Sequence, residues 1–451
     1  MADSRRSLPA DGRAHDGVGH AVADLVAQAL PGGGRVAVAL SGGRDSIVLL
    51  DAASRITARA RIALIAFHVH HGLSPNADRW SLFCRDACAE RAIAFVSRHV
   101  CVTRAARVSV EAAARKLRYD TLAALAQAHA VDAVLLGHHA DDQAETVLLQ
   151  LLRGAGPRGL AAMPAIAIDR GVRWLRPFLA MTRQTLDAEV AARRLAYIDD
   201  ESNADARYRR NALRAGVVPA LRAMAPGYPE TLVRAARHQA EAAALLDELA
   251  ALDARGACDG ATLDRAALRS LRPPRARNLL RWFLRERGLP APSSARLGEM
   301  LRQLTSAGDD ARTTLVHAGA ELGVHRGRVC VHRRAPGAYR LEWSGDGSIA
   351  LPHGTLVFDA AAGEGIAARH LAASRVTLRS GTPGERLRAG GHVRRGVADL
   401  LREAGVPEWA RIGVPRVYCG DALAAVACAG VDAAFAAAPG EPAVALGWHP
   451  D

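Results

Sequence analysis

The sequence predicts an α/β fold, a doubly wound parallel sheet, followed by a helical domain and a small α+β C-terminal domain. Short apolar runs at 35–40, 62–69, 94–100 and 133–138 alternate with helical stretches. Fully apolar runs are typical of interior parallel strands, and strand–helix alternation is typical of a doubly wound sheet. Polar clusters follow the first, second and fourth runs, where ligands bind in such sheets.

The helices that complete this pattern are expected at about 45–55, 79–92, 109–130 and 141–153, and one more at 182–194. Strands joined through helices run parallel and connect with one hand. The four strands are therefore expected to form a single sheet.

The second half of the chain has a different pattern. Long helices begin near residue 224, short alternating runs follow from about 312, and the final segment mixes strands with a helix at 397–405. The sequence therefore predicts an N-terminal tail or helix, an α/β domain, a mainly helical domain, a linker and an α+β domain, at residues 1–32, 33–222, 223–340, 341–371 and 372–445.

The charge balance favours a polyanionic partner. The chain has 59 basic and 46 acidic residues, a formal net charge of +13 and an expected pI of about 10.2. Lys116 is the only lysine, and the planar guanidinium of arginine suits phosphate oxygens. A bias in base composition accounts for arginine over lysine, whereas the net excess favours nucleic acid.

The same composition predicts a cytoplasmic protein with no membrane partner. No apolar run approaches the ~20 residues that span a bilayer, and residues 1–20 lack the apolar stretch of a secretory signal. Seven cysteines, an odd number, fit a reducing compartment better than a disulfide framework.

The loop after the first strand has the composition of an anion site. Residues 36–53 read "VAVALSGGRDSIVLLDAA", a strand, a Ser-Gly-Gly turn and a helix that starts near Asp45. Glycines let the backbone approach phosphate, and the first amides of a helix point outward. The run is neither a Walker A loop nor a dinucleotide fingerprint. A tight turn capped by Ser or Asp is the alternative.

Residues 41–46 resemble the SGGxDS PP-loop of the N-type ATP pyrophosphatases. Those enzymes hold the β,γ-pyrophosphate of ATP and cleave between the α and β phosphates. The resemblance implies an adenine nucleotide α-hydrolase-like fold. It also implies that ATP is bound by Ser41, Gly42, Gly43, Arg44, Asp45, Ser46 and His71.

The stretch after the second strand indicates which of the PP-loop families the chain resembles. "HVHHGL" at 68–73 resembles the "HVxHGLR" of the tRNA(Ile)-lysidine synthetases. Taken alone, a histidine-rich strand end is also compatible with a metal site or with simple exposure, although zinc has a clearer ligand spacing.

An acidic cluster follows the fourth strand, in "GHHADDQAETVLLQLLRGAGPRGL" at 137–160, and this stretch matches the same family. Asp141, Asp142 and Glu145 stand beside two histidines. Three acids near a triphosphate can hold Mg²⁺ or a cationic amine. The alternative is helix capping, since Asp142 and Glu145 have the spacing of a capping box. One cap needs one acid, so we favour a functional cluster in which the same Asp can do both.

Two further stretches continue the resemblance. "EAAARKLRY" at 111–119 borders the active-site cleft in the family, which makes Arg115 and Arg118 candidate contacts for phosphate or substrate. Its alternative is a solvated ladder of ion pairs. "DDESNADARYRRNALR" at 199–214 is similar to the family segment DxSNxDxxYxRNxxR, and its alternative is a polar surface loop. The positions that align in it are Asp199 or Asp200, Ser202, Asn203, Asp205, Tyr208, Arg210, Asn211 and Arg214.

The resemblance covers residues 36 to about 220 strongly and the rest more weakly, as two tRNA-binding domains. In the C-terminal one of these two domains, Glu385-Arg386-Leu387 stands where Asp-Arg-Phe is typical of the family, so we expect the details of its tRNA contact to differ from those of the family. On the helix near 280, Arg277, Arg281 and Arg285 form a basic ridge at i, i+4 spacing, which predicts tRNA contacts. A solvated helix face would look the same.

The resemblance also implies the reaction. ATP and Mg²⁺ bind the N-terminal domain, and the C2 oxygen of cytidine 34 in a tRNA(Ile) with a CAU anticodon attacks the α-phosphate. Pyrophosphate leaves, and the ε-amine of free lysine displaces AMP to give lysidine. A second copy of this chain, in a homodimer, is a further partner that the sequence leaves open.

Individual roles follow from this chemistry as hypotheses. The expected catalytic residues are Asp45, Asp141, Asp142, Glu145 and Arg118, with Asp45 and Asp142 as metal ligands. Glu145 would receive the lysine amine, and Arg210 or Arg214 would face phosphate or the lysine carboxylate.

Three other functions are weighed against this one. A PP-loop tRNA thiolase usually needs paired cysteines, but Cys84 and Cys88 have three residues between them and no Cys-x-x-Cys occurs. A non-catalytic RNA-binding protein with a relic ATP loop is disfavoured by the intact run 41–46. An amidotransferase-type synthetase would need a glutaminase, and no such pattern is evident.

Overall fold

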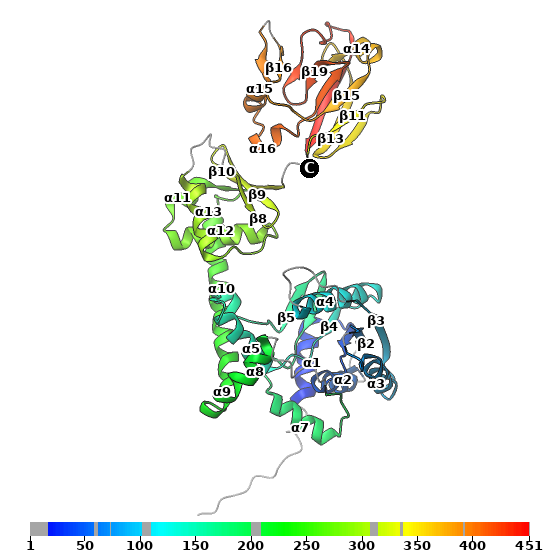
Figure 1. Cartoon of the computed structure of the whole chain (residues 1–451), viewed down its shortest axis with the longest axis vertical. Helices are drawn as coiled ribbons and strands as arrows, with labels where there is room; N and C mark the ends of the chain where they lie inside the picture. Colours follow the sequence, from blue (N-terminus) through cyan, green and yellow to red (C-terminus); the bar gives the residue numbers. More distant parts are fainter. Residues whose placement is uncertain are drawn as a thin grey trace, which may run out of the picture. The chain divides into compact units, whose positions relative to one another are not determined.

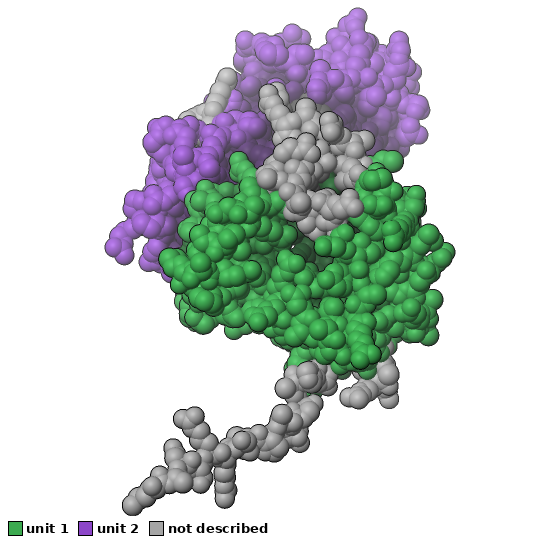
Figure 2. All heavy atoms as spheres, turned by 60° about the horizontal axis from the view of Figure 1, so that its bottom comes forward, with its two compact units in different colours: residues 1–245 green, residues 246–451 purple. Residues whose placement is uncertain are grey.

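The computed structural model describes residues 17–57, 62–72, 74–101, 110–199, 209–306, 314–333, 337–390 and 393–450. The chain divides into two compact units, Met1–Leu245 and Leu246–Asp451, coloured separately in Figure 2. Within the described ranges, no helix is both long and apolar enough to cross a membrane.

Unit 1 is built on a six-stranded sheet in the order β3-β2-β1-β4-β6-β5. All neighbours are parallel except β5 and β6, which form an antiparallel edge. The doubly wound parallel sheet is therefore confirmed. The strands are β1 (Gly34–Ala39), β2 (Ile62–His70), β3 (Ala94–His99), β4 (Ala133–Leu135), β5 (Ile166–Asp169) and β6 (Val172–Leu175).

Helices flank this sheet on both faces (Figure 1). The helices of unit 1 are α1 (Gly17–Ala29), α2 (Arg44–Thr57), α3 (Ala77–Ala89), α4 (Val110–Ala128), α5 (Ala140–Leu151), α6 (Pro157–Leu160), α7 (Arg183–Arg193), α8 (Arg209–Gly216), α9 (Val218–Met224) and α10 (Tyr228–Ala254), whose last turns belong to unit 2. Five of them agree with the helices expected within the α/β domain, namely α2, α3, α4, α5 and α7. Helix α1 falls in the expected N-terminal tail or helix and α10 agrees with the long helix expected after residue 224, whereas α6, α8 and α9 are additional. Helices α9 and α10 pack with α5 in a cluster apart from the two sheet cores.

Strand β1 contributes to two cores, which explains why its sequence is apolar from Val36 to Ala39. Val36 and Val38 pack with α1, α2, α3 and α7, whereas Ala37 packs on the opposite face with α4 and Trp174. All four of these side chains are at most 1% exposed. A strand covered on both faces cannot alternate between apolar and polar residues.

Two features of unit 1 differ from the sequence expectation. Residues 1–32 were expected to precede the α/β domain, but Val22 and Val26 of α1 lie in the same core as β1. Strands β5 and β6 were not expected, because each has only four residues and Arg173 interrupts the second. Arg173 donates to the carbonyl of Ala29 at 3.0 Å and so joins β6 to the end of α1.

The first part of unit 2 packs helices against the sheet β7-β10-β9-β8. Its core contains Leu279, Leu280 and Phe283 of α12, all 0% exposed. The elements are β7 (Thr262–Asp264), α11 (Arg265–Ser270), α12 (Pro273–Glu286), α13 (Ser294–Ser306), β8 (Thr314–His317), β9 (Ala320–His325) and β10 (Arg328–Arg333).

The second part of unit 2 is an α+β module, as expected, but it begins earlier. Residues 341–371 were expected to form a linker, yet they contain strands that pair with β15 and β21 and share one core with them. The elements are β11 (Arg340–Glu342), β12 (Ser348–Leu351), β13 (Gly354–Ala362), β14 (Ile366–Ala367), α14 (Ala368–Ala373), β15 (Val376–Arg379), β16 (Arg386–Leu387), β17 (Arg395–Gly396), α15 (Val397–Glu403), α16 (Glu408–Arg411), β18 (Arg416–Cys419), β19 (Ala422–Val426), β20 (Gly430–Val431) and β21 (Pro442–Pro450).

Helix α1 is predicted to stabilise the α/β domain. Val22→Ala removes buried methyl groups at a site with 0% exposure and should lower the free energy of unfolding of unit 1 by about 1–3 kcal/mol. Gln28→Ala, at an exposed site on the same helix, should change it by less than about 0.5 kcal/mol. Urea unfolding of the full chain measures both, and equal stabilities would contradict this role for α1.

Candidate active site

The loop between β1 and α2 requires glycine at position 42. Gly42 has φ of +87°, and an added Cβ would lie 2.8 Å from Cδ1 of Ile198 and 3.1 Å from Sγ of Cys84. The amide of Ile198 donates to the Gly42 carbonyl at 2.9 Å, so the chain beyond α7 closes over the loop. The backbone is thus held in a conformation that other residues rarely adopt.

Two serines shape the same loop from inside. The Ser46 hydroxyl donates to the Gly43 carbonyl at 2.8 Å, and the Ser41 amide donates to the Ser46 oxygen at 3.2 Å. The Gly43 amide lies 3.3 Å from the Ser41 hydroxyl. Helix α2 begins at Arg44, and the amides of Ser46 and Ile47 donate to the Gly43 carbonyl at 3.0 and 3.1 Å. An anion would therefore bind at the remaining first-turn amides, those of Arg44 and Asp45.

The side chain of Arg44 is directed at acids. It donates to Asp187 of α7 at 2.7 Å and to Asp45 at 3.1 Å, and only 12% of it is exposed. Burial lowers the pKa of Arg44, but Asp45 and Asp187 outweigh burial and raise it. The expected phosphate contact of Arg44 is therefore available through its backbone, while its side chain ties α2 to α7.

Gly137 brings the acidic cluster to this loop. An added Cβ at Gly137 would lie 3.0 Å from the Asp45 carbonyl oxygen and 3.3 Å from the Ser46 amide nitrogen. Glycine at this position therefore lets the segment after β4 approach the start of α2 this closely. Sequence reasoning passed over this residue, although it opens the quoted stretch 137–160.

His139 lies between three carboxylates. Its Nε2 is 3.6 Å from Oδ2 of Asp45 and 3.6 Å from Oδ2 of Asp142, and its Nδ1 is 3.5 Å from Oδ2 of Asp141. Burial lowers the pKa of His139, but the three acids outweigh burial and raise it. The histidine joins the phosphate loop to the acidic cluster, a role not assigned from the sequence.

The cap at the start of α5 is not the Asp142–Glu145 pair that the sequence spacing offers as an alternative. His139 is the N-cap residue of α5, and its amide donates to Oδ2 of Asp142 at 3.1 Å. Asp142 thus both caps the helix and belongs to the cluster. The alternative capping pair of Asp142 and Glu145 is not formed, because His139 is the N-cap and Glu145 lies inside the helix.

Asp142 and Glu145 form a buried network with two arginines of α8. Arg210 donates from Nε to Glu145 at 2.5 Å and from Nη2 to Asp142 at 2.8 Å. Arg214 donates from Nε to Glu145 at 2.6 Å and from Nη2 to Asp142 at 3.2 Å. Burial raises the pKa of Asp142, but His139 and Arg210 outweigh burial and bring it to about 2. Both arginines therefore face acids rather than open solvent.

Asp141 is occupied by α7. Its Oδ2 accepts the Arg183 amide at 2.8 Å, at the start of that helix, and its Oδ1 lies 3.7 Å from Nη2 of Arg222. These contacts indicate that Asp141 positions α7 and α9 against the cluster.

Arg118 and His71 lie close to the same cluster. The guanidinium of Arg118 interacts with the charges of Asp142 and Arg210, and burial lowers its pKa. Within the described ranges, Arg118 has no ion-pair partner. Burial and the Arg118 charge lower the pKa of His71 to about 4, so its imidazole is neutral. Arg118, whose guanidinium also lies 5.9 Å from the ring of Tyr119, and the neutral His71 are together suited to an anionic substrate.

Other sequence candidates are only partly tested. Arg115 lies over the ring of Tyr119 at 5.3 Å. The positions Asp200, Ser202, Asn203, Asp205 and Tyr208, and the side chain of Glu111, lie outside the described residues.

The carboxylates fit a magnesium ion that also contacts ATP. Oxygen ligands from one or two carboxylates, completed by phosphates, are what Mg²⁺ prefers. The Asp45 side chain is 30% exposed and shares His139 with Asp142. Among the described residues, no group of three or more His, Cys, Asp or Glu could hold a metal unaided.

In unit 2, the three arginines of the expected ridge are not equivalent. Arg285 donates to Asp247 at 2.7 Å. In the part of the chain that the structure describes, Arg277 and Arg281 have no acidic partner. Burial and the Arg277 charge lower the pKa of Arg281. Counting only partners among the described residues, the ridge thus has two cations without an acidic partner, Arg277 and Arg281.

Family models match three parts of the chain. A PP-loop domain matches residues 18–221, a TilS substrate binding domain matches 263–330, and a TilS substrate C-terminal domain matches 376–448. The PP-loop match implies use of ATP and agrees with the parallel sheet.

Curated relatives match nearly the whole chain. A tRNA(Ile)-lysidine synthase of Azoarcus is 41% identical over 94% of each chain, and that of Nitrosomonas europaea is 36% identical over 100% of this chain and 98% of its own. Among solved structures, the U34-tRNA thiolase NcsA from Methanococcus maripaludis is 17% identical with a TM-score of 0.44, over 50% of this chain and 78% of that one, a likeness too low to carry an argument. On the full-length matches, the chain belongs to the tRNA(Ile)-lysidine synthase family.

Proposed function

We propose that this chain ligates lysine to C2 of cytidine 34 in the CAU anticodon of tRNA(Ile), with ATP converted to AMP and pyrophosphate. The observation that carries the proposal is His139, which joins the acid of the phosphate loop to the acids of α5. A two-step ligase needs its phosphate site and its amine site in contact, because the second step displaces what the first step attached. We place the protein in the cytoplasm, with tRNA, ATP and lysine.

The first step uses the start of α2. The first-turn amides after Gly43 stabilise the charge that develops on the leaving pyrophosphate. Asp45 and Asp142 would hold Mg²⁺, which neutralises phosphate charge when bound. Arg118 supplies a cation for the α-phosphate or for the lysine carboxylate.

The second step uses the acids of α5. Asp142, with a pKa of about 2, stays ionised and is better suited to attract the lysine ammonium than to accept its proton. We assign the same role to Glu145, three residues along the same helix, so that the lysine amine meets two carboxylates. Arg210 and Arg214 share these acids and so set the charge that the substrate amine meets.

Sulfur transfer is the alternative that the structure argues against. Burial raises the pKa of Cys84 to about 12 and that of Cys88 to about 11. A thiolate is the reactive form of cysteine, and neither thiol would form one at neutral pH.

The reaction is tested directly with purified protein, ATP, radiolabelled lysine and unmodified CAU-anticodon tRNA(Ile). Label should enter nucleoside 34, in proportion to the AMP formed. Absence of label, or incorporation only of sulfur from a sulfur donor, would overturn the proposal.

Asp45→Ala should lower AMP formation at least about 100-fold, since the acid next to the phosphates is lost. Binding of tRNA, measured by filter retention, should stay nearly unchanged. Asp86→Ala, an exposed acid on α3, is the control and should keep full activity. Normal turnover of Asp45→Ala would remove Asp45 from the metal site.

Glu145→Gln should separate the two steps. Loss of one charge-assisted contact should raise the KM for lysine at least about tenfold. Pyrophosphate release without lysine should fall by less than about threefold. Both are read on the same preparation, and an unchanged KM for lysine would exclude Glu145 from the amine site.

Arg281→Gln should weaken tRNA binding and reduce the slope of log Kd against log salt by about 1. Arg285→Gln should change the tRNA affinity and the salt slope less than Arg281→Gln does, because Asp247 already neutralises Arg285. Titrations at several salt concentrations distinguish the two. Equal effects of both variants would contradict the assignment of Arg281 as a phosphate contact.

A further inference from the structure

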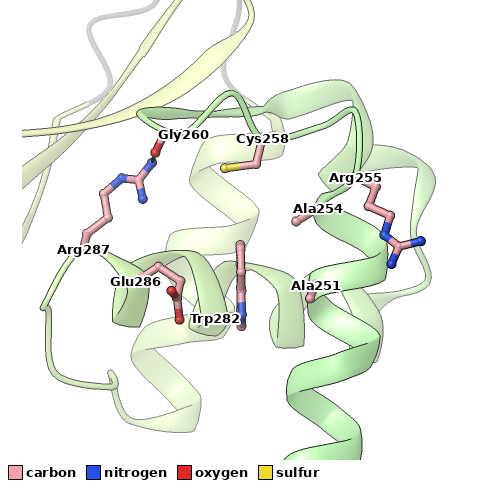
Figure 3. Close-up of a pocket in the computed structure, with 8 residues that line it drawn as sticks. All are labelled: Ala251, Ala254, Arg255, Cys258, Gly260, Trp282, Glu286 and Arg287. Atoms are coloured by element: carbon pink, nitrogen blue, oxygen red, sulfur yellow. Dashed lines mark hydrogen bonds between the residues drawn. The ribbon is translucent and has the colours of Figure 1, made fainter.

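A cavity of about 420 Å³ lies in unit 2, away from the phosphate loop in the sequence and unused by the proposed chemistry. It opens between α10, α12 and the turn that follows α10 (Figure 3). Its lining residues are Ala251, Ala254, Arg255, Cys258, Gly260, Trp282, Glu286 and Arg287.

The walls of this pocket suit a flat aromatic ring. Ala251 and Ala254 of α10 point toward Trp282 of α12, and their small side chains leave space beside the indole (Figure 3). Trp282 is the one aromatic residue of the lining and is only partly buried against the core. Bases of unpaired nucleotides stack on such side chains.

The polar groups of the pocket are suited to a nucleotide. Glu286, one turn after Trp282, has Oε1 at 3.6 Å from Nη2 of Arg285, and its other carboxylate oxygen can accept from the amino group of a base. Arg255 is exposed and, among the residues that the structure describes, has no ion-pair partner. Arg287 donates to the carbonyl of Ala261 at 3.2 Å and stacks on Phe283 at 4.2 Å, so it fixes the turn. One cation is therefore left for a phosphate.

We infer that this pocket binds one unpaired nucleotide of the tRNA, with its base against Trp282 and its phosphate on Arg255. The volume lies at the lower end of the range for small-ligand pockets, which fits one nucleotide rather than a stacked run. The net charge of +13 favours a polyanion, and the TilS substrate binding domain, 263–330, supplies Trp282, Glu286 and Arg287. The inference rests on the proposed function only in taking tRNA as the occupant.

Cys258 provides a reporter inside the pocket, because its thiol points into the same space (Figure 3). Its alkylation by iodoacetamide is followed by mass spectrometry in the full chain, with and without saturating unmodified CAU-anticodon tRNA(Ile). We expect at least about tenfold slower alkylation when tRNA is bound. Unchanged alkylation, with tRNA binding verified by filter retention, would overturn the inference.

A second arm distinguishes the source of the nucleotide. The four nucleoside monophosphates are added one at a time, each at the molar concentration used for tRNA. The inference predicts no protection of Cys258 by any of them, because one nucleotide lacks the other tRNA contacts. Protection equal to that by tRNA would mean a free-nucleotide site and would overturn the tRNA assignment.

Arg255→Gln should weaken tRNA binding about tenfold, the loss expected for one charged contact to phosphate. Arg302→Gln is the matched control in the same unit, since Arg302 is exposed and already paired with Glu299, and it should change Kd less than about twofold. Equal Kd values for Arg255→Gln and the parent chain would contradict the pocket assignment.

Failure of this inference and failure of the proposed function give different results. If the pocket does not bind a nucleotide of the tRNA, Cys258 stays reactive with tRNA bound while lysine still enters nucleoside 34. If the ligation is wrong, lysine is not incorporated, whereas protection of Cys258 by tRNA is measured independently of ATP and lysine.

Discussion

The close approach of two chain segments at Gly137 is the constraint on which the site depends. Strands β1 and β4 are parallel neighbours, so the loops at their carboxyl ends lie at one edge of the sheet. An added Cβ at Gly137 would lie 3.0 Å from the Asp45 carbonyl oxygen. A side chain at this position would push the two backbones apart by a few tenths of an ångström. The sheet brings the two segments together, and one glycine sets the distance between them.

That contact creates an electrostatic requirement. Asp141, Asp142 and Glu145 are each at most 8% exposed, and buried carboxylates are costly unless they are paired. His139, Arg210 and Arg214 supply the positive charge. A cationic substrate that enters such a cluster meets acids that already have partners, so binding redistributes existing ion pairs. We expect the positions of α5 and α8 to matter as much as the acids themselves.

Much of the fold was predictable because β1 and its neighbours are buried on both faces, which produces apolar runs. Strands β5 and β6 have four residues each and leave no such pattern. Residues 341–371 have the sequence pattern of a linker, because their short strands pair with partners far away in the sequence, such as β21, and no local pattern reveals that pairing. The acids were found from local spacing, whereas Arg210 meets Glu145 across 65 residues, a pairing that only the tertiary structure reveals. The roles of Gly137 and His139 likewise depend on contacts with α2.

The most direct measurement is an experimental structure of the full chain with a non-hydrolysable ATP analogue. The account predicts the β and γ phosphates at the first-turn amides of α2, with Asp45 beside them and His139 between Asp45 and the acids of α5. Phosphates bound elsewhere, or loop amides turned toward the protein core with no room for phosphate, would contradict it.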